Sequence, residues 1–86
     1  MRSRVSRSFR EAFRKLNPKI QEIARQKYQL WCEDEFHPSL HFKQVNKGRF
    51  RSARVGLHYR ALGLPVPDGV QWFWIGSHAD HDRIAG

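Results

Sequence analysis

The sequence predicts an α+β domain in which an N-terminal helical hairpin covers one face of an antiparallel sheet of three or four strands. Apolar residues recur at helical spacing in the first third of the chain, and from His37-Pro38 onward they gather in short, turn-bounded segments typical of strands. At 86 residues, 40% of them hydrophobic, the chain has material for one modest core. We therefore expect residues 1–86 to form a single domain.

The first helix is expected to begin at Ser8, because Ser8 and Glu11 have the spacing of a capping box. Its buried face follows from four apolar residues at helical spacing, which are Phe9, Ala12, Phe13 and Leu16. Asn17-Pro18 should end this helix and start the next, since Asn caps helices and Pro is tolerated at the first helical position.

The second helix carries an apolar face from Ile20 to Trp31. The acidic run Glu33–Glu35 lies where the helix dipole does not favour negative charge, so it marks the helix exit. With a short connection between them, the two helices are predicted to pack as a hairpin.

Strand character is found in four segments, Leu40–Val45, Phe50–Val55, Tyr59–Leu62 and Val70–Ile75. The last is apolar at every position except Gln71, as expected of a central strand covered on both sides. Pro65, Pro67 and Asp68-Gly69 are expected to form the longest loop. Residues 2–6 can add a short further strand.

Sixteen Lys and Arg against eight Asp and Glu give a net charge of +8, which favours a polyanionic partner such as RNA or an acidic protein. The alternative is an evenly charged surface without such a partner. Cys32 is the single cysteine, so no internal disulfide can form and nothing indicates an oxidising compartment. No apolar segment follows the Arg- and Ser-rich start, and Phe9–Leu16 is too charged to enter a membrane, so we expect a cytoplasmic protein.

Ionisable side chains follow the last strand. The apolar segment Trp72–Ile75 is followed by Gly76–Asp82, which contains polar and ionisable residues. A strand end holds catalytic groups rigidly. Arg49, Arg51 and Arg54 alternate in a way that predicts one shared sheet face, with Arg60 on the neighbouring strand. We expect these arginines and His78 to share that face.

Trp72 and Trp74 are two residues apart and are predicted to point to the same face. Exposed aromatic rings there could stack on RNA bases. Their position in the most apolar strand favours packing in the core instead.

A metal site is the alternative use of the residues after the last strand, which include His78, Asp80, His81 and Asp82. Four potential ligands crowded into five positions rarely all converge on one ion. No spaced pair of Cys or His residues supports them elsewhere. We therefore expect no metal and no organic cofactor.

The chain resembles the RelE/ParE toxin superfamily, the toxic halves of bacterial toxin–antitoxin pairs. The residues that carry the resemblance are Phe9–Leu16 with Ile20–Ala24, His37-Pro38-Ser39-Leu40, Tyr59-Arg60-Ala61-Leu62 and Trp74-Ile75-Gly76-Ser77-His78-Ala79-Asp80. These motifs are short, and their order and spacing over nearly the whole chain make them specific.

The resemblance implies a microbial RNase fold and, in the RelE-like branch, metal-independent cleavage of mRNA in the ribosomal A site. It implies a cognate antitoxin, the ribosome and mRNA as partners. Arg60 falls where RelE-like toxins often place an arginine near the scissile phosphate, and His78 where several relatives carry a catalytic His or Arg. The Tyr that RelE-like members often have near the C-terminus is absent, and His81 lies in its neighbourhood. Both His78 and His81 thus remain candidates for proton transfer.

The residue types suit this chemistry independently of the resemblance. Cleaving RNA without a metal requires proton transfer from the 2′-hydroxyl group and cations to stabilise charge on the phosphate. Histidine transfers protons near neutral pH, and arginine matches phosphate with a planar, permanently charged fork. We assign proton transfer to His78, phosphate contact to Arg60 and Arg54, and guidance of the RNA backbone to Lys43 and Lys47. The RNA-binding candidates are Lys43, Lys47, Arg49, Arg51 and Arg54.

Three alternatives stay open. The arginines can be solvent-facing strand residues or ion-pair partners of the antitoxin, and His78 can merely end the strand by hydrogen bonding a loop carbonyl. A ParE-like toxin would bind DNA gyrase and inhibit it without hydrolysis, using no proton-transfer group. A degenerate binding module would act only with its partner. An antitoxin should bring acidic and apolar residues to cover the basic surface.

Overall fold

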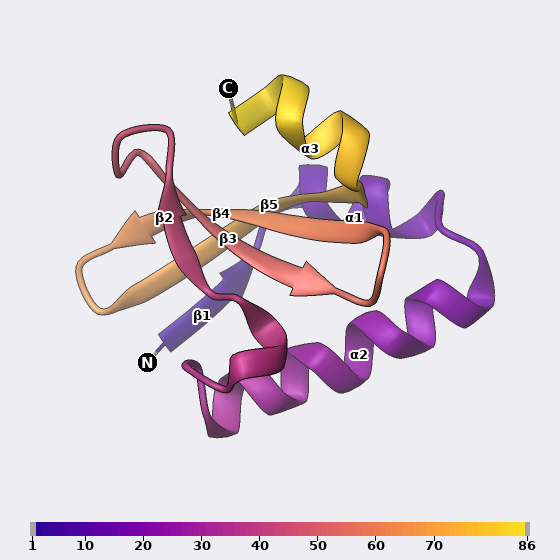
Figure 1. Ribbon diagram of the computed structural model, residues 1–86, viewed down its shortest axis with the longest axis horizontal. Coiled ribbons are helices and arrows are strands. Elements are labelled where there is room, and N and C mark those ends of the chain that lie inside the picture. Colours follow the sequence, from indigo (N-terminus) through magenta and orange to yellow (C-terminus); the bar gives the residue numbers. More distant parts are fainter. Residues whose placement is uncertain (1, 86) are drawn as a thin grey trace.

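The computed structural model describes residues 2–85 and contains three helices, one short 3₁₀ turn and five strands (Figure 1). In chain order these are β1 (Arg2–Val5), α1 (Arg7–Arg14), α2 (Pro18–Glu33), η1 (Pro38–Leu40), β2 (Lys43–Val45), β3 (Phe50–Val55), β4 (Tyr59–Val66), β5 (Gly69–Ser77) and α3 (His78–Ala85). The predicted α+β class is confirmed.

The sheet has five strands in the order β1-β5-β4-β3-β2. Neighbours among β2 to β5 are antiparallel, whereas β1 runs parallel to β5 from Arg2 opposite Gly69 to Val5 opposite Trp72. The further strand expected at residues 2–6 is confirmed as β1, whereas the expectation of a sheet that is antiparallel throughout was wrong. The N-terminal segment adds the parallel edge strand, so β5 becomes an interior strand.

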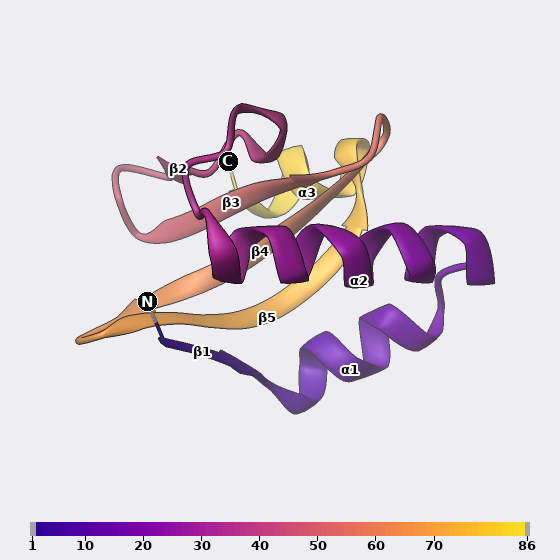
Figure 2. The same ribbon diagram turned by 90° about the horizontal axis from the view of Figure 1, so that it is seen from below.

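Helices cover both faces of the sheet (Figure 2). α1 and α2 lie on one face, where α1 contacts β5 and α2 contacts β3, while α3 packs against β4 and β5. α1 and α2 diverge from their connection rather than packing along their lengths, so the predicted helical hairpin is opened. The core lies beneath them and contains Ala24, Trp31, Leu40, Ala53, Val55, Ala61, Val70, Trp72 and Ile75.

Side-chain caps set the helix starts. Ser6 caps α1, because its hydroxyl oxygen accepts a hydrogen bond from the backbone N–H of Phe9 (3.2 Å). The capping box predicted at Ser8 was wrong, since the Ser8 hydroxyl donates instead to the carbonyl of Phe73 (2.7 Å). Asn17 caps α2 as predicted, accepting from the N–H of Ile20 at 3.0 Å, and Asp34 ends it.

β4 and β5 form a long hairpin where a loop was expected. Val66 lies opposite Gly69, so only Pro67 and Asp68 remain in the turn. Pro65 is accommodated inside β4 because the pairing of β3 with β4 ends at Gly63. Beyond that point β4 is an edge, where the missing N–H of proline removes no hydrogen bond from the sheet.

A β-bulge in β5 separates the two tryptophans. Leu62 lies opposite Trp74 and Gly63 opposite Trp72, so Phe73 is an extra residue on β5. Trp72 and Trp74 consequently face opposite sides of the sheet, and the prediction of a shared face was wrong. Trp72 is buried against Trp31, with ring centroids 5.3 Å apart, whereas Trp74 is only half-buried.

α3 is an element that the sequence pattern did not predict. Its start is stabilised by the Ser77 hydroxyl oxygen, which accepts from the N–H of Asp80 (3.2 Å). It covers Leu62 and Ser52, which are 0% and 2% exposed. Within residues 2–85, no helix is long and apolar enough to cross a membrane.

We predict that Trp72→Ala lowers the free energy of unfolding by about 3–5 kcal/mol, because it opens a cavity in the core. Trp74→Ala should cause a clearly smaller loss, since the Trp74 ring is half-buried on the other face. Urea titrations followed by circular dichroism measure both. Equal losses would contradict the separation of the two rings by the bulge.

Candidate active site

The candidate active site lies on the sheet face that α3 covers. Three side chains of α3, those of His78, His81 and Asp82, occupy positions i, i+3 and i+4 and therefore share one side of the helix. β3 and β4 supply Ser52, Arg54 and Arg60. The site thus joins the C-terminal helix to the middle of the sheet.

His81 is the buried member of the site, with 6% of its surface exposed. A hydrogen bond of 2.9 Å joins its Nε2 to the hydroxyl of Ser52, which is itself 2% exposed. Its Nδ1 lies 3.2 Å from Oδ1 of Asp82. Both ring nitrogens therefore have partners, which hold the imidazole in one orientation.

His78 is the accessible member of the site, with 54% of its side chain exposed. Its Nε2 lies 3.4 Å from Oδ2 of Asp82, and its ring is stacked on that of His81 with centroids 6.2 Å apart. The backbone N–H of His78, not its ring, donates to a loop carbonyl, that of His58 (2.7 Å). The imidazole is thus left facing solvent beside a carboxylate.

Arg60 and Arg54 bring two positive charges together, because they lie directly opposite each other on β4 and β3. Partial burial, followed by the charge of Arg54, lowers the pKa of Arg60 from its ordinary value, and the carboxylate of Asp82 opposes that shift. The Arg60 guanidinium remains charged at neutral pH. Two adjacent cations of this kind form a site for an anion such as phosphate.

The remaining RNA-binding candidates are spread over the sheet. Lys43 is exposed on β2 opposite Ser52, and so belongs to the same face as the site. Arg51 is three residues from Arg54, so the two point to opposite faces, and the expected shared face was wrong. The Arg51 guanidinium donates to the carbonyl of Gly48 (3.0 Å) and supports the turn that contains Lys47 and precedes Arg49.

Ser52 and the bridging role of Asp82 were missed by sequence reasoning. The signal for Asp82 was its spacing of four residues from His78, which is apparent only once α3 is recognised as a helix. Ser52 carries no comparable signal, because its contact with His81 spans 29 residues. Asp80, by contrast, pairs with Arg83 and turns away from the cluster.

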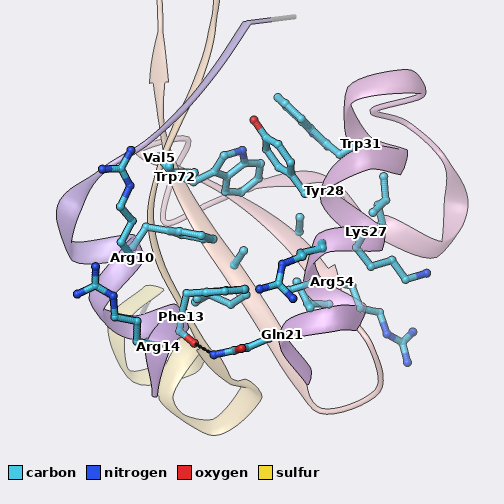
Figure 3. A pocket seen from close by; sticks show the side chains of 18 residues that line it. Val5, Arg10, Phe13, Arg14, Gln21, Lys27, Tyr28, Trp31, Arg54 and Trp72 are labelled. Carbon is cyan, nitrogen blue, oxygen red and sulfur yellow. Dashed lines mark hydrogen bonds between the residues drawn. The ribbon is translucent and has the colours of Figure 1, made fainter. Parts of the chain in front are cut away.

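A groove lies on the other face of the sheet, between α1 and α2 (Figure 3). Its volume is about 490 Å³, and its apolar floor includes Phe13, Trp31 and Trp72. The cations that line it are Arg10, Arg14, Arg25, Lys27 and Arg54. Arg54 therefore lines the groove and also lies close enough to Arg60 for its charge to act on that residue.

Two polar groups beneath this groove lack partners. Within residues 2–85, the buried indole N–H groups of Trp31 and Trp72 find no hydrogen-bond acceptor. Arg25 lies over the ring of Phe13, 5.2 Å from its centroid, and Gln21 donates to the Phe13 carbonyl (3.0 Å). The groove thus combines an apolar floor with a positively charged border.

Comparison with known proteins identifies the fold. No protein-family model matches the chain, and neither does any curated protein sequence. Among solved structures, the chain is similar to the copper-bound crystal structure of a mutant toxin from Helicobacter pylori, with a TM-score of 0.63 and 14% sequence identity. The similarity covers 93% of this chain and 97% of that toxin. The protein therefore has the fold of a bacterial toxin over nearly its whole length.

Proposed function

We propose that this protein is the toxin of a toxin–antitoxin pair and acts as a metal-independent, ribosome-dependent mRNA endonuclease. The observation that carries the proposal is the placement of an accessible imidazole, that of His78, on the same face as the paired cations Arg54 and Arg60. The net charge of +8, the toxin fold and the RelE/ParE-like motifs support it.

His78 is the proton-transfer group in this proposal. It takes the proton of the RNA 2′-hydroxyl group as that oxygen attacks the phosphorus. The bond to the 5′-oxygen breaks, and the leaving 5′-oxygen takes a proton from solvent water. Arg60 and Arg54 stabilise the negative charge that grows on the phosphate oxygens. His81 is too deeply buried to reach RNA, so we assign it a positioning role, in which it holds Asp82 against His78.

The antitoxin is proposed to occupy the groove between α1 and α2. An apolar floor selects apolar side chains, and the cations Arg10, Arg14, Arg25 and Lys27 select carboxylates. A segment of the antitoxin that is apolar on one side and acidic on the other satisfies both. Because Arg54 borders both the groove and Arg60, such a segment can also reduce the positive field at the active site.

His78→Ala is predicted to lower the rate of mRNA cleavage on ribosomes by about 10²-fold or more, because it removes the proton acceptor. Its fold should persist, since the ring is exposed. His41→Asn is the matched control, because His41 is an exposed histidine with positive φ (45°), a conformation that Asn tolerates. Cleavage is measured by mapping RNA ends.

Wild-type cleavage by His78→Ala would overturn the assignment of His78. Intact mRNA together with gyrase complexes stalled on DNA would overturn the nuclease proposal as a whole and support gyrase inhibition. Unchanged growth on expression without an antitoxin would count against any toxin function.

Arg60→Gln is predicted to abolish most cleavage without lowering stability. The depressed pKa of Arg60 means that its charged form is less favourable in the folded protein than in the unfolded chain. Losing the charge therefore removes the cost of its partial burial and the repulsion with Arg54. Urea denaturation midpoints and cleavage rates separate the two effects. A large loss of stability would instead identify Arg60 as a structural residue.

Charge reversal at the border of the groove is predicted to slow antitoxin binding while leaving cleavage unchanged. The double variant Arg10→Glu, Arg14→Glu should associate more slowly at low salt and lose most of the salt dependence of the wild type. Lys19→Glu, on exposed α2 outside the groove, is the control. The partner is the protein whose co-expression restores growth, and stopped-flow mixing gives the rates. Equal rates for all three proteins would exclude this groove as its docking site.

A further inference from the structure

The cluster of His78, His81 and Asp82 has a second chemical capacity. One ligand atom from each residue can be chosen so that all three lie within 4.8 Å of one another. The sequence led us to expect that the four potential ligands in this segment would not all converge. Three of them come together, whereas Asp80 pairs with Arg83. Spacing of i, i+3 and i+4 on α3 produces this convergence.

The spacing of the atoms fits a transition-metal ion. Imidazole nitrogen and carboxylate oxygen bind such ions at about 2.0–2.2 Å, so two neighbouring ligands of one ion lie about 3.0–3.5 Å apart. His78 Nε2 is 3.4 Å from Oδ2 of Asp82, and His81 Nδ1 is 3.2 Å from Oδ1 of the same carboxylate. The carboxylate of Asp82 therefore lies beside each imidazole at a distance that two ligands of one ion can have, and a small movement of the exposed His78 ring would complete the site.

Ser52 gives this cluster a feature common in built metal sites. When Nδ1 of His81 binds an ion, Nε2 carries the proton and must donate it to a fixed acceptor. The hydroxyl of Ser52 lies 2.9 Å from that nitrogen and is held by β3. In the metal-free protein Nδ1 of His81 donates to the Asp82 carboxylate. Because the Ser52 hydroxyl can accept as well as donate, it can take the Nε2 proton when Nδ1 binds an ion instead.

We propose that His78, His81 and Asp82 form a binding site for one divalent transition-metal ion. Two imidazoles and one carboxylate suit Cu²⁺, Ni²⁺ and Zn²⁺ better than Mg²⁺ or Ca²⁺, and the general order of affinities places Cu²⁺ first. The exposure of His78 and Asp82 leaves the remaining coordination positions to water and gives the ion access from solvent.

Binding would also switch off the enzyme, and this consequence rests on the proposed function. An ion on Nε2 of His78 occupies the lone pair that would accept the 2′-hydroxyl proton. Cleavage should therefore fall as the site fills, and a chelator should restore it. The ion is an inhibitor in this scheme and takes no part in the reaction.

The binding test uses the full chain in a Cys32→Ser background, because the exposed thiol of Cys32 is itself a soft metal ligand. Calorimetric titration with Zn²⁺ should give one site per chain in the wild-type sequence. His78→Ala and Asp82→Asn should abolish this site, and Ser52→Ala should weaken it by about 10- to 100-fold. His41→Asn should bind as the parent does, and Mg²⁺ should not compete.

Copper spectroscopy identifies the ligands directly. The electron paramagnetic resonance spectrum of the Cu²⁺-loaded parent should contain hyperfine structure from two imidazole nitrogens, reduced to one in His78→Ala. Circular dichroism confirms that each variant is folded. A site that survives unchanged in both His78→Ala and Asp82→Asn would overturn the proposal.

Cleavage assays distinguish failure of the site from failure of the proposed function. Zn²⁺ binding with the predicted variant pattern but without inhibition of RNA cleavage supports the metal site and counts against His78 as the proton acceptor. Inhibition that is equally strong in the parent and in Ser52→Ala would contradict inhibition through this cluster, because Ser52 supports the cluster and lies outside the RNA-facing surface.

Discussion

The hydrogen bond between Ser52 and His81 is the contact on which the rest of the site depends. Both side chains are almost fully buried, so either one left unpaired would cost about 1–3 kcal/mol. The bond attaches α3 to the middle of the sheet and fixes the rotation of the helix about its axis. That rotation decides where His78 and Asp82 point, because they lie on the same side of α3.

The bulge in β5 determines which aromatic side chains lie on each of the two faces of the sheet, the face covered by α1 and α2 and the face covered by α3. The extra residue Phe73 reverses the alternation, sending Trp72 into the core under α2 and Trp74 to the side of α3. Trp72 then forms part of the floor of the groove, while Gly76, covered by the Trp74 ring, leaves no room for a side chain beside it. A regular β5 would place both indoles on one face and leave the other without its aromatic layer.

Local signals in the sequence predicted the elements they act on directly. Asn17-Pro18 located the start of α2, and apolar periodicity located β3 and β5. The errors arose where a contact distant in the chain decides the outcome. A further strand at residues 2–6 was expected, but its parallel pairing with β5 was not. Pro65 stays within β4 because the pairing with β3 has already ended. No pattern within either segment contains that information.

The site was predictable to the same extent. His78 and Arg60 were proposed from residue type and from the resemblance, and their roles remain predictions. The fold places them on the same face with Arg54. Ser52 was not proposed, since its contact with His81 joins residues 29 positions apart in the sequence. The prediction for Arg51 was wrong because side chains alternate along a strand. Arg51 and Arg54 are three residues apart and therefore face opposite sides of the sheet.

Proton transfer and metal binding draw on one and the same group, and this links the two proposals. Nε2 of His78 has a single lone pair, which a proton or a metal ion can occupy but not both. Asp82 takes part in either use, since its carboxylate lies beside both imidazoles. His81 is buried, whereas His78 is exposed to solvent. The substrate proton and the metal ion therefore compete at Nε2 of His78. The proposed inhibition by a metal ion therefore uses His78, His81 and Asp82, the same residues that the proposed metal-independent cleavage already uses.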